Sequence, residues 1–190
     1  MTVIAGPPGS GKSTAFPVAG IGMVFFNADD RAAELNAGSY HGISQSIRQI
    51  VNREFETFVL GCIARGESFA IETTLRSSVT FEQARMAREA GFTVEMRYLA
   101  LDSFSMHLER IKIRSDAGGH SASEATLRRI YESSIRSLSQ AIHEVDELHV
   151  YDNSQLDSEP RFVMEARDGL IVFLAEDPPR WLTEAFGWQA

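Results

Sequence analysis

A glycine-rich octapeptide follows a short apolar run at the start of this chain. Residues 6–13 read Gly-Pro-Pro-Gly-Ser-Gly-Lys-Ser, directly after Thr-Val-Ile-Ala at 2–5. A strand that ends in Gly-x-x-x-x-Gly-Lys-Ser predicts a loop whose backbone N–H groups cradle phosphates, because glycine adopts conformations that a Cβ forbids. A helix that begins near Gly11 would add the positive end of its dipole. The motif therefore predicts a strand–loop–helix unit that binds a nucleotide.

Each position of this loop has an expected task. Lys12 reaches the β- and γ-phosphates, and Ser13 offers its hydroxyl to Mg²⁺. The chain has 18 Lys plus Arg residues, but only Lys12 and Lys112 are lysines, so the lysine in the motif agrees with a need for a compact charge. The residues expected to contact the nucleotide are Gly6, Pro7, Pro8, Gly9, Ser10, Gly11, Lys12, Ser13 and Thr14.

Composition limits the class of protein. With 190 residues, of which 44% are hydrophobic and 23% charged, the chain fits one soluble domain over residues 1–190. The net charge of −8 makes nucleic-acid or anionic-membrane binding unfavourable, and no apolar stretch reaches the roughly 20 residues of a membrane helix. Cys62 is the only cysteine, and the N-terminus leads into a strand rather than a signal peptide, so we expect a cytoplasmic protein.

Strands alternate with helices along the chain. Short continuous apolar runs predict buried strands, and apolar residues at helical spacing predict helices. The expected strands are 2–5, 23–26, 68–71, 92–101 and 148–151, and the expected helices are 28–37, 44–65, 79–90, 103–115 and 124–145. This order predicts an α/β fold, a P-loop NTPase three-layer sandwich with a mainly parallel sheet and helices on both faces. A C-terminal hairpin that turns at Asp168-Gly169, followed by a short tail helix, should occupy residues from about 160 to 190.

Polar residues follow several expected strands where these end. Asn27 to Asp30 follow the second strand, Glu72 to Thr74 end the third, and Asp152-Asn153 follow the fifth. Ligands of such folds bind at the carboxyl ends of the parallel strands. We therefore expect these segments to share one rim of the sheet with the loop 6–13.

A phosphate-binding loop indicates a nucleotide but not a reaction. GTPases carry Asn-Lys-x-Asp, which this chain lacks. AAA-type and transport ATPases are usually longer, and they pair the loop with four apolar residues followed by Asp-Glu, for which the chain offers no good match. A small kinase has the right size, and it needs an acceptor pocket, a base for the acceptor hydroxyl and arginines around the transferring phosphoryl group.

Asp29 is the expected base. It follows the second strand, which we expect next to the loop, and a carboxylate there can take the proton of a substrate hydroxyl. Its alternative task is to cap the following helix, which Asn27 or Asp30 could also do. Glu72 could position Mg²⁺ or bind an acceptor hydroxyl, and Arg76 can reach an anionic group of the acceptor.

Two arginines predict a lid over the phosphates. Arg110 and Arg114 are spaced i, i+4 and share one helix face, and Gly118-Gly119 follow as a flexible break. Guanidinium groups bind phosphate bidentately, so we expect a helical lid over residues from about 110 to 125. Alternatively, both arginines lie on a solvated face and pair with neighbouring acids.

Taken in order, these segments resemble the zeta-toxin-like P-loop kinases, which are similar to phosphotransferases such as chloramphenicol phosphotransferase. The likeness extends over residues 2–154 and lies in Gly6 to Ser13, Asn27 to Asp30, Ile71 to Thr74, Arg110 with Arg114, Gly118 to His120, Arg128 to Ser133 and Asp152 to Ser154. The resemblance implies an ATP-dependent kinase of a nucleotide-sugar hydroxyl. In characterised zeta toxins the acceptor is UDP-N-acetylglucosamine, at the sugar 3′-hydroxyl.

The resemblance also implies tasks for individual residues and a partner. Asp29 would be the base, and the phosphates would be held by Lys12, Arg110 and Arg114. Asn153 would lie near adenine, and the acceptor site would comprise Glu72, Thr74, Arg76 and His120 near the lid. Family members often act as toxins that a small helical antitoxin neutralises. The chain departs from the family after Gly-Gly-His, where Ser-Ala-Ser stands in place of an apolar residue and proline.

Two other functions stay open from the sequence. The chain could be an ATP-binding module that docks a protein partner without acceptor phosphorylation, which an exposed Trp181, Phe186 and Trp188 patch would favour. It could also be a kinase of another acceptor, such as NAD, a nucleoside or a polynucleotide end. A basic groove leading to Asp29 would favour the polynucleotide.

Overall fold

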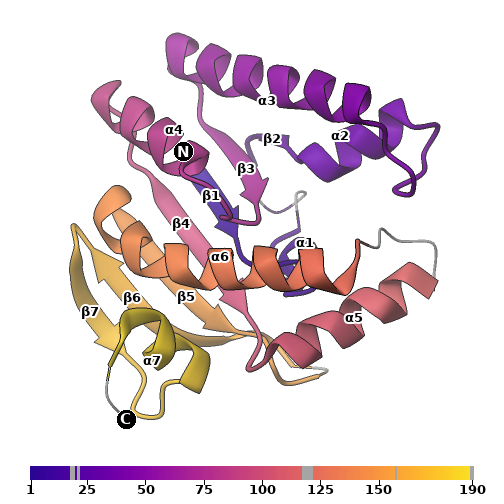
Figure 1. Ribbon diagram of the computed structural model, residues 1–190. Coiled ribbons are helices and arrows are strands. Elements are labelled where there is room, and N and C mark those ends of the chain that lie inside the picture. The colour runs from indigo at the N-terminus through magenta and orange to yellow at the C-terminus, as the bar shows by residue number, and fades with distance from the viewer. Residues whose placement is uncertain (18–19, 21, 117–121, 157, 189–190) are drawn as a thin grey trace.

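The computed structural model describes residues 1–17, 20, 22–116, 122–156 and 158–188 (Figure 1). Its strands are β1 (Thr2–Ala5), β2 (Val24–Phe26), β3 (Phe69–Thr73), β4 (Glu95–Ala100), β5 (Glu147–Asp152), β6 (Arg161–Arg167) and β7 (Leu170–Leu174). Its helices are α1 (Lys12–Ala15), α2 (Ala28–Leu35), α3 (Gln45–Arg65), α4 (Val79–Glu89), α5 (Phe104–Asp116), α6 (Glu124–Glu144) and α7 (Arg180–Phe186). In this part of the chain, no helix combines the length and apolarity that crossing a membrane requires.

The helix that follows the loop is a single turn. α1 has four residues, and its N-cap Gly11 takes a left-handed conformation with φ 91°. A macrodipole depends on aligned peptide groups over successive turns, so a single turn adds little to phosphate binding. The amides of the loop itself must therefore supply most of the expected attraction for phosphate.

The strands form one sheet in the order β2-β3-β1-β4-β5-β6-β7. β1 pairs in parallel with β3 and β4, β2 pairs in parallel with β3, and β5, β6 and β7 pair antiparallel. This mainly parallel sheet confirms the expected fold class. The expectation that the second strand lies next to the loop was wrong, because β3 lies between β2 and β1. Glu72, on β3, is therefore the acidic residue on the strand next to the loop, and Asp29 lies one strand further away.

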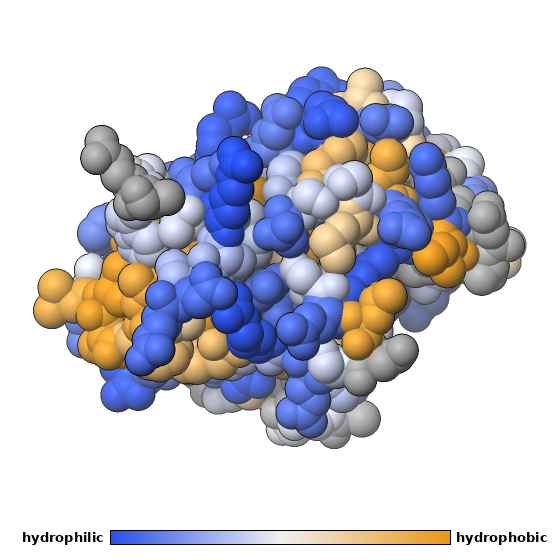
Figure 2. Space-filling view, turned by 90° about the horizontal axis from the view of Figure 1, so that it is seen from below, coloured by the Kyte–Doolittle hydropathy of each residue, from blue (hydrophilic) through white to orange (hydrophobic). Residues whose placement is uncertain are grey.

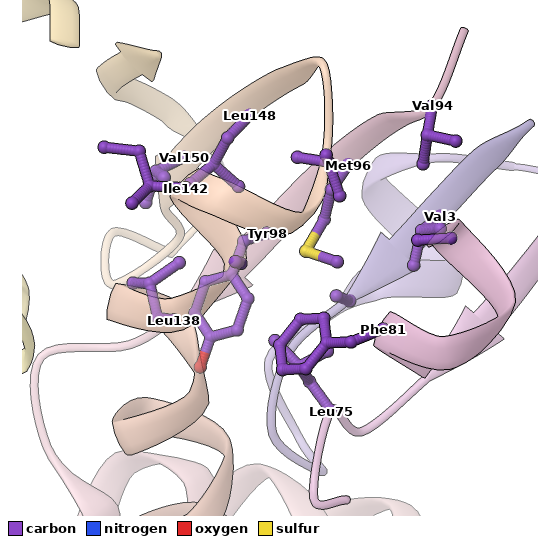
Figure 3. Packing of buried hydrophobic residues seen from close by; sticks show 14 of the residues in the cluster. Val3, Leu75, Phe81, Val94, Met96, Tyr98, Leu138, Ile142, Leu148 and Val150 are labelled. Carbon is purple, nitrogen blue, oxygen red and sulfur yellow. The ribbon is translucent and has the colours of Figure 1, made fainter. Parts of the chain in front are cut away.

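The core lies on one face of the sheet. Alternate strand residues, such as Val3, Met96 and Val150, pack with buried residues of α3, α4, α6 and α7. Figure 3 shows Leu138 beside Tyr98, with Met96 between the strands and Phe81. Because burial of apolar side chains is the main favourable term in folding, this layer of helices fixes the positions of the strand ends.

The other face of the sheet is covered differently. Arg97 and Tyr151 alternate along their strands with the core residues Tyr98 and Val150, so they point to the opposite face. Phe16, directly after α1, packs on that face, with its ring centroid 5.3 Å from that of Tyr151 and 5.6 Å from the Arg97 guanidinium carbon.

The C-terminal segment forms the expected hairpin and tail helix. β6 and β7 are joined by Asp168 and Gly169, whose φ values of 49° and 79° suit a two-residue hairpin turn. α7 buries Trp181 at 2% exposure, and the rings of Phe186 and Trp188 stack on each other and pack against the core. The tail is thus hydrophobic cover, and the exposed Trp181, Phe186 and Trp188 patch that would favour a docking module is not formed.

The exposed apolar residues gather instead on the edge strand β7. Its five residues Leu170, Ile171, Val172, Phe173 and Leu174 are 41–70% exposed. Figure 2 shows the corresponding apolar patch at the left end of the molecule, where Figure 1 places β7. The strand contains neither a proline nor a charged residue, which are the usual means of protecting a sheet edge.

Candidate active site

The loop between β1 and α1 runs in close contact with neighbouring elements. A Cβ at Gly6 would lie 2.1 Å from the Leu99 carbonyl oxygen on β4, and one at Gly11 would lie 2.5 Å from Asn153 Nδ2. Both residues also have positive φ values, 144° and 91°. Space and backbone conformation therefore both demand glycine, which is the physical reason for these two motif positions.

Lys12, Ser13 and Glu72 lie together at the end of the loop. Lys12 is 7% exposed, and its Nζ donates to the carbonyl oxygens of Gly6 at 3.0 Å and Pro7 at 3.3 Å. The same Nζ lies 3.8 Å from Glu72 Oε1, and Ser13 Oγ donates to Glu72 Oε2 at 3.0 Å. The structure thus brings Glu72, which is distant in the sequence, to the two loop residues Lys12 and Ser13.

The oxygen atoms of Ser13 and Glu72 fit a magnesium site. Within the described residues, no group of three or more His, Cys, Asp and Glu side chains could hold a metal ion. Mg²⁺ needs no such group, because it keeps several waters and binds through one or two protein oxygens plus substrate phosphates. Ser13 Oγ and Glu72 Oε2, 3.0 Å apart beside the loop, offer two oxygens of this kind.

Asp29 lies in the first turn of α2 with its side chain exposed. Asn27 caps this helix, and its Oδ1 accepts from the backbone N–H groups of Asp29 at 2.9 Å and Asp30 at 3.3 Å. The Asp30 carboxylate accepts from the Tyr40 hydroxyl at 2.8 Å. No hydrogen bond or ion pair from the described residues occupies the Asp29 carboxylate, so it is available to a ligand. Asn27 instead caps the helix, and the Asp30 carboxylate binds the Tyr40 hydroxyl.

The segment after β3 carries Thr74 and Arg76, which are half-buried and exposed respectively. Leu75 between them is fully buried and has a φ of 53°, in the left-handed region that a leucine rarely adopts. Its backbone N–H donates to Thr73 Oγ1 at 3.1 Å. Burial of Leu75 therefore holds the turn. Thr74 and Arg76 follow Glu72 at the carboxyl end of β3, but neither makes a described contact with the loop.

Arg110 lies on α5 beside the loop. Its Nη2 donates to the Asn153 carbonyl oxygen at 2.8 Å, and Nδ2 of Asn153 donates to the Ser10 carbonyl oxygen at 2.8 Å. Arg110 and Asn153 are thus brought to the loop as the sequence led us to expect. The side chain of Arg114 and all of His120 lie outside the described residues, as does much of the lid segment, 117–121.

His107 was not selected from the sequence, yet it touches the loop. Its ring is buried at 1% exposure, with Nδ1 2.9 Å from the Pro8 carbonyl oxygen and Nε2 3.0 Å from the Leu101 backbone nitrogen. Burial above all, with smaller contributions from the charges of Lys12 and Arg110, lowers the pKa of the imidazole from 6.5 to about 4. The spacing of His107 and Arg110, three apart on one helix face, is the signal that could have drawn attention to it.

The depressed pKa of His107 predicts a pH-dependent stability. The unfolded chain takes up the proton near pH 6.5 and the folded protein only near pH 4, so the unfolded state binds more protons between these values and stability falls as pH falls. From pH 7.5 to pH 5 this single group should cost the wild type about 2 kcal/mol. Chemical denaturation of His107→Asn should lack that loss, whereas a His41→Asn variant, at an exposed site, should keep it. Equal pH slopes in wild type and His107→Asn would contradict the assignment.

A pocket of about 1010 Å³ opens beside the loop. One wall is aromatic, since the rings of Phe16 and Tyr151 meet edge to face. Its size and its mixture of apolar and polar walls suit a nucleotide. The lining residues are Gly9, Gly11, Thr14, Ala15, Phe16, Pro17, Arg110, Tyr151, Asn153, Gln155, Leu156, Ser158, Glu159 and Pro160.

A family profile matches residues 1–134, the part of the chain that holds the loop, Asp29, Glu72 and Arg110. The profile is AAA_33, described as an AAA domain. The chain belongs to the AAA_33 family. This membership corrects the sequence argument that set AAA-type proteins aside for lack of four apolar residues followed by Asp-Glu. A shorter form of that signal was present, because Phe69-Ala70-Ile71 leads directly into Glu72, which the structure places beside Lys12 and Ser13.

A short stretch of this AAA_33 protein matches a curated protein sequence. That relative is an uncharacterized protein of Haemophilus influenzae, 32% identical over 63 residues, a match that covers 33% of this chain and 45% of the relative. The matched stretch therefore spans less than half of the relative's length, and the match assigns no activity.

Solved structures share the fold across most of the chain. A chain of the PezAT chromosomal toxin–antitoxin system of Streptococcus pneumoniae matches with a TM-score of 0.63 and 15% identity, over 100% of this chain and 79% of that one. The AvrRxo1-ORF1:-ORF2 structure with ATP matches at 0.65 and 15%, over 90% and 59%. A putative kinase from Chloroflexus aurantiacus J-10-fl matches at 0.52 and 19%, over 68% and 77%. At these identities the likeness establishes the fold, which is P-loop kinase-like.

Proposed function

We propose that this AAA_33 protein is an ATP-dependent kinase that transfers the γ-phosphoryl group to a hydroxyl of a small acceptor. The observation that carries the proposal is the contact of Glu72 with both Lys12 and Ser13, beside the pocket of about 1010 Å³. A buried lysine, a hydroxyl and a carboxylate at the end of a glycine loop are the groups that hold a triphosphate and its magnesium ion. The fold shared with a putative kinase supports the same reaction class.

Asp29 would serve as the base of this reaction. The acceptor hydroxyl oxygen bonds to the γ-phosphorus, its proton passes to the Asp29 carboxylate, and the bond to the β–γ bridging oxygen breaks to release ADP. The exposure of Asp29, and the helix cap that Asn27 provides in its place, support this assignment. Because β3 lies between β2 and β1, the ends of these two strands are two strand spacings apart, roughly 10 Å, and the acceptor must bridge this distance to reach both the phosphate and the base.

The chain's own cations would stabilise charge on the transferring group. Lys12 and Arg110 lie at the loop, and Arg114 follows Arg110 by one helical turn. Positioned cations of this kind supply much of the rate enhancement in phosphoryl transfer. Mg²⁺ held by Ser13 and Glu72 would neutralise phosphate charge when ATP is bound, and the lid expected over residues from about 110 to 125 would exclude water.

We infer a nucleotide-containing acceptor, and UDP-N-acetylglucosamine is the first compound to test. Glu72, Thr74, Arg76 and His120 would form its site, and the domain would comprise residues 1–190. The PezAT and AvrRxo1 structures are of a toxin–antitoxin system and of a two-component complex, which supports a small helical antitoxin as partner and a toxic role in cells. Asn153 in the pocket wall supports its task near adenine.

The test is a transfer assay with γ-labelled ATP and Mg²⁺. Acceptors in parallel reactions are UDP-N-acetylglucosamine, other UDP-sugars, NAD and nucleosides, with a short RNA as the polynucleotide arm. We expect label on a UDP-sugar and none on RNA. ATP binding with no label on any acceptor would contradict the kinase and favour a binding module. A toxic enzyme should inhibit growth when it is expressed, and co-expression of a small helical protein encoded beside it should relieve the inhibition.

The magnesium assignment makes its own prediction. Glu72→Gln keeps the shape of the side chain but removes its charge, so the Mg²⁺ concentration for half-maximal activity should rise by about tenfold. Glu89→Gln, at an exposed position on α4, is the matched control and should leave the Mg²⁺ titration unchanged. An unchanged titration in Glu72→Gln would place the metal elsewhere.

A further inference from the structure

The ring of His107 joins three parts of the molecule. It stands on α5, contacts the loop at the Pro8 carbonyl and contacts the Leu101 backbone nitrogen just after β4. The Leu101 amide can only donate, so Nε2 must accept, and Nδ1 must carry the proton that is donated to Pro8. On a fourth side, the Tyr131 ring of α6 lies edge-on with centroids 5.1 Å apart. The bonding pattern thus fixes both the orientation of the ring and its neutral tautomer.

The bond to Pro8 has a geometric consequence for the next amide. In a planar trans peptide the C=O and the following N–H point in opposite directions. A carbonyl of Pro8 that is held outward by His107 therefore turns the Gly9 N–H inward. The same relation holds one step along the loop, where Asn153 holds the Ser10 carbonyl and so turns the Gly11 N–H inward.

The backbone of His107 constrains the same stretch. A Cβ at Gly9 would lie 2.6 Å from the His107 carbonyl oxygen, so the loop passes directly against this turn of α5. One turn further along α5, Arg110 fixes Asn153 through its carbonyl oxygen at 2.8 Å. Both outward-held carbonyls of the loop are therefore tied, directly or through Asn153, to the helix that leads into the expected lid.

We propose that His107 is a positioning residue, which through its Nδ1–H aims the Gly9 amide of the loop at the nucleotide phosphates. The inference deepens the proposed function and rests on it for the identity of the ligand. His107 acts through the loop and touches no reacting atom.

A matched pair of substitutions separates the two nitrogens. His107→Asn puts an amide N–H near the place of Nδ1 and can keep the bond to Pro8, while losing the acceptor for Leu101. His107→Gln reaches further and can accept from Leu101, while losing the donor to Pro8. We expect the Gln variant to weaken ATP binding, measured by calorimetry, by about tenfold, and the Asn variant to stay within about threefold of wild type. Leu138→Ala, a cavity in the core far along α6, controls for general loss of stability.

Hydrogen exchange of the nucleotide-free protein gives a second readout. The Gly9 amide should exchange faster in His107→Gln than in His107→Asn or Leu138→Ala, because its peptide plane is no longer held. The ¹⁵N spectrum of wild type at pH 7 should show a protonated Nδ1 and an unprotonated Nε2. Equal ATP affinities in the Asn and Gln variants, or equal exchange of the Gly9 amide, would overturn the proposal.

These readouts also separate this proposal from the proposed function. A protein that binds ATP with the expected Asn and Gln difference, yet labels no acceptor, would retain His107 as a positioning residue and lose the kinase. A wild-type protein that binds no ATP would refute the nucleotide site. Faster exchange of the Gly9 amide in His107→Gln than in His107→Asn would then still show that His107 orients this amide, and equal exchange would refute that task as well.

Discussion

Lys12→Ala is expected to lower kcat/KM for phosphoryl transfer by about 10²–10³-fold and to weaken ATP binding. The Lys12 ammonium group is almost wholly buried, and it lies between two loop carbonyl oxygens and Glu72. A charge in such a dry position acts on a triphosphate more strongly than an exposed one, because water screens it less. Steady-state kinetics with γ-labelled ATP measure the loss, and thermal denaturation establishes that the variant is folded.

The chain offers a matched control for this substitution. Lys112 is the only other lysine, and it is exposed on α5. Lys112→Ala removes the same charge and the same number of atoms, so it should keep kcat/KM within about twofold of wild type, as exposed charges away from the site contribute little. Wild-type kinetics in Lys12→Ala, or an equal loss in both variants, would refute the assigned task of Lys12.

Asp29→Asn is expected to lower kcat by about 10²–10⁴-fold while leaving the affinity for ATP within about twofold of wild type. The amide preserves the size of the side chain but cannot accept the hydroxyl proton. Because α2 is capped by Asn27, the substitution leaves the helix cap in place. Pre-steady-state transfer rates and calorimetric binding of ATP separate the chemical step from nucleotide binding.

The neighbouring carboxylate provides the control for Asp29. Asp30 is also exposed and also in the first turn of α2, but its carboxylate accepts from the Tyr40 hydroxyl. Asp30→Asn should therefore retain near wild-type kcat. Normal turnover by Asp29→Asn would refute Asp29 as the base. If Glu72→Gln then stayed inactive at saturating Mg²⁺, the base would be assigned to Glu72, which lies on the strand next to the loop.

Local sequence patterns predicted most of the helices and strands, because apolar spacing and turn residues act over a few neighbouring positions. Apolar spacing located the helices from α2 to α6, and Asp168-Gly169 located the hairpin, since both residues take the positive φ that this turn needs. The glycine loop was predicted correctly for a similar reason. Its close contacts with Leu99 and Asn153 could not be read from the sequence, although they are what makes glycine necessary at Gly6 and Gly11.

The order of the strands was beyond the reach of local patterns. Whether the second or the third strand lies next to β1 depends on how helices pack across the whole sheet, and nothing near Asp29 or Glu72 records it. In the structure Glu72 therefore lies beside the loop, and Asp29 lies one strand further from the loop than Glu72 does. His107 was passed over because a single histidine among apolar helix residues resembles a core residue until its two ring nitrogens are placed.

The exposed edge strand β7 affects the solubility of the protein in the cell and in concentrated preparations. Five exposed apolar side chains and a row of unpaired backbone N–H and C=O groups lie along this edge, and the strand has no proline or charged residue that would prevent another strand from pairing with it. An extended segment of another chain, such as a newly synthesised copy that is still folding, could pair with β7 as an additional β-strand. The cell must therefore keep β7 covered or the concentration of the protein low. Purified preparations should aggregate most readily when they are concentrated.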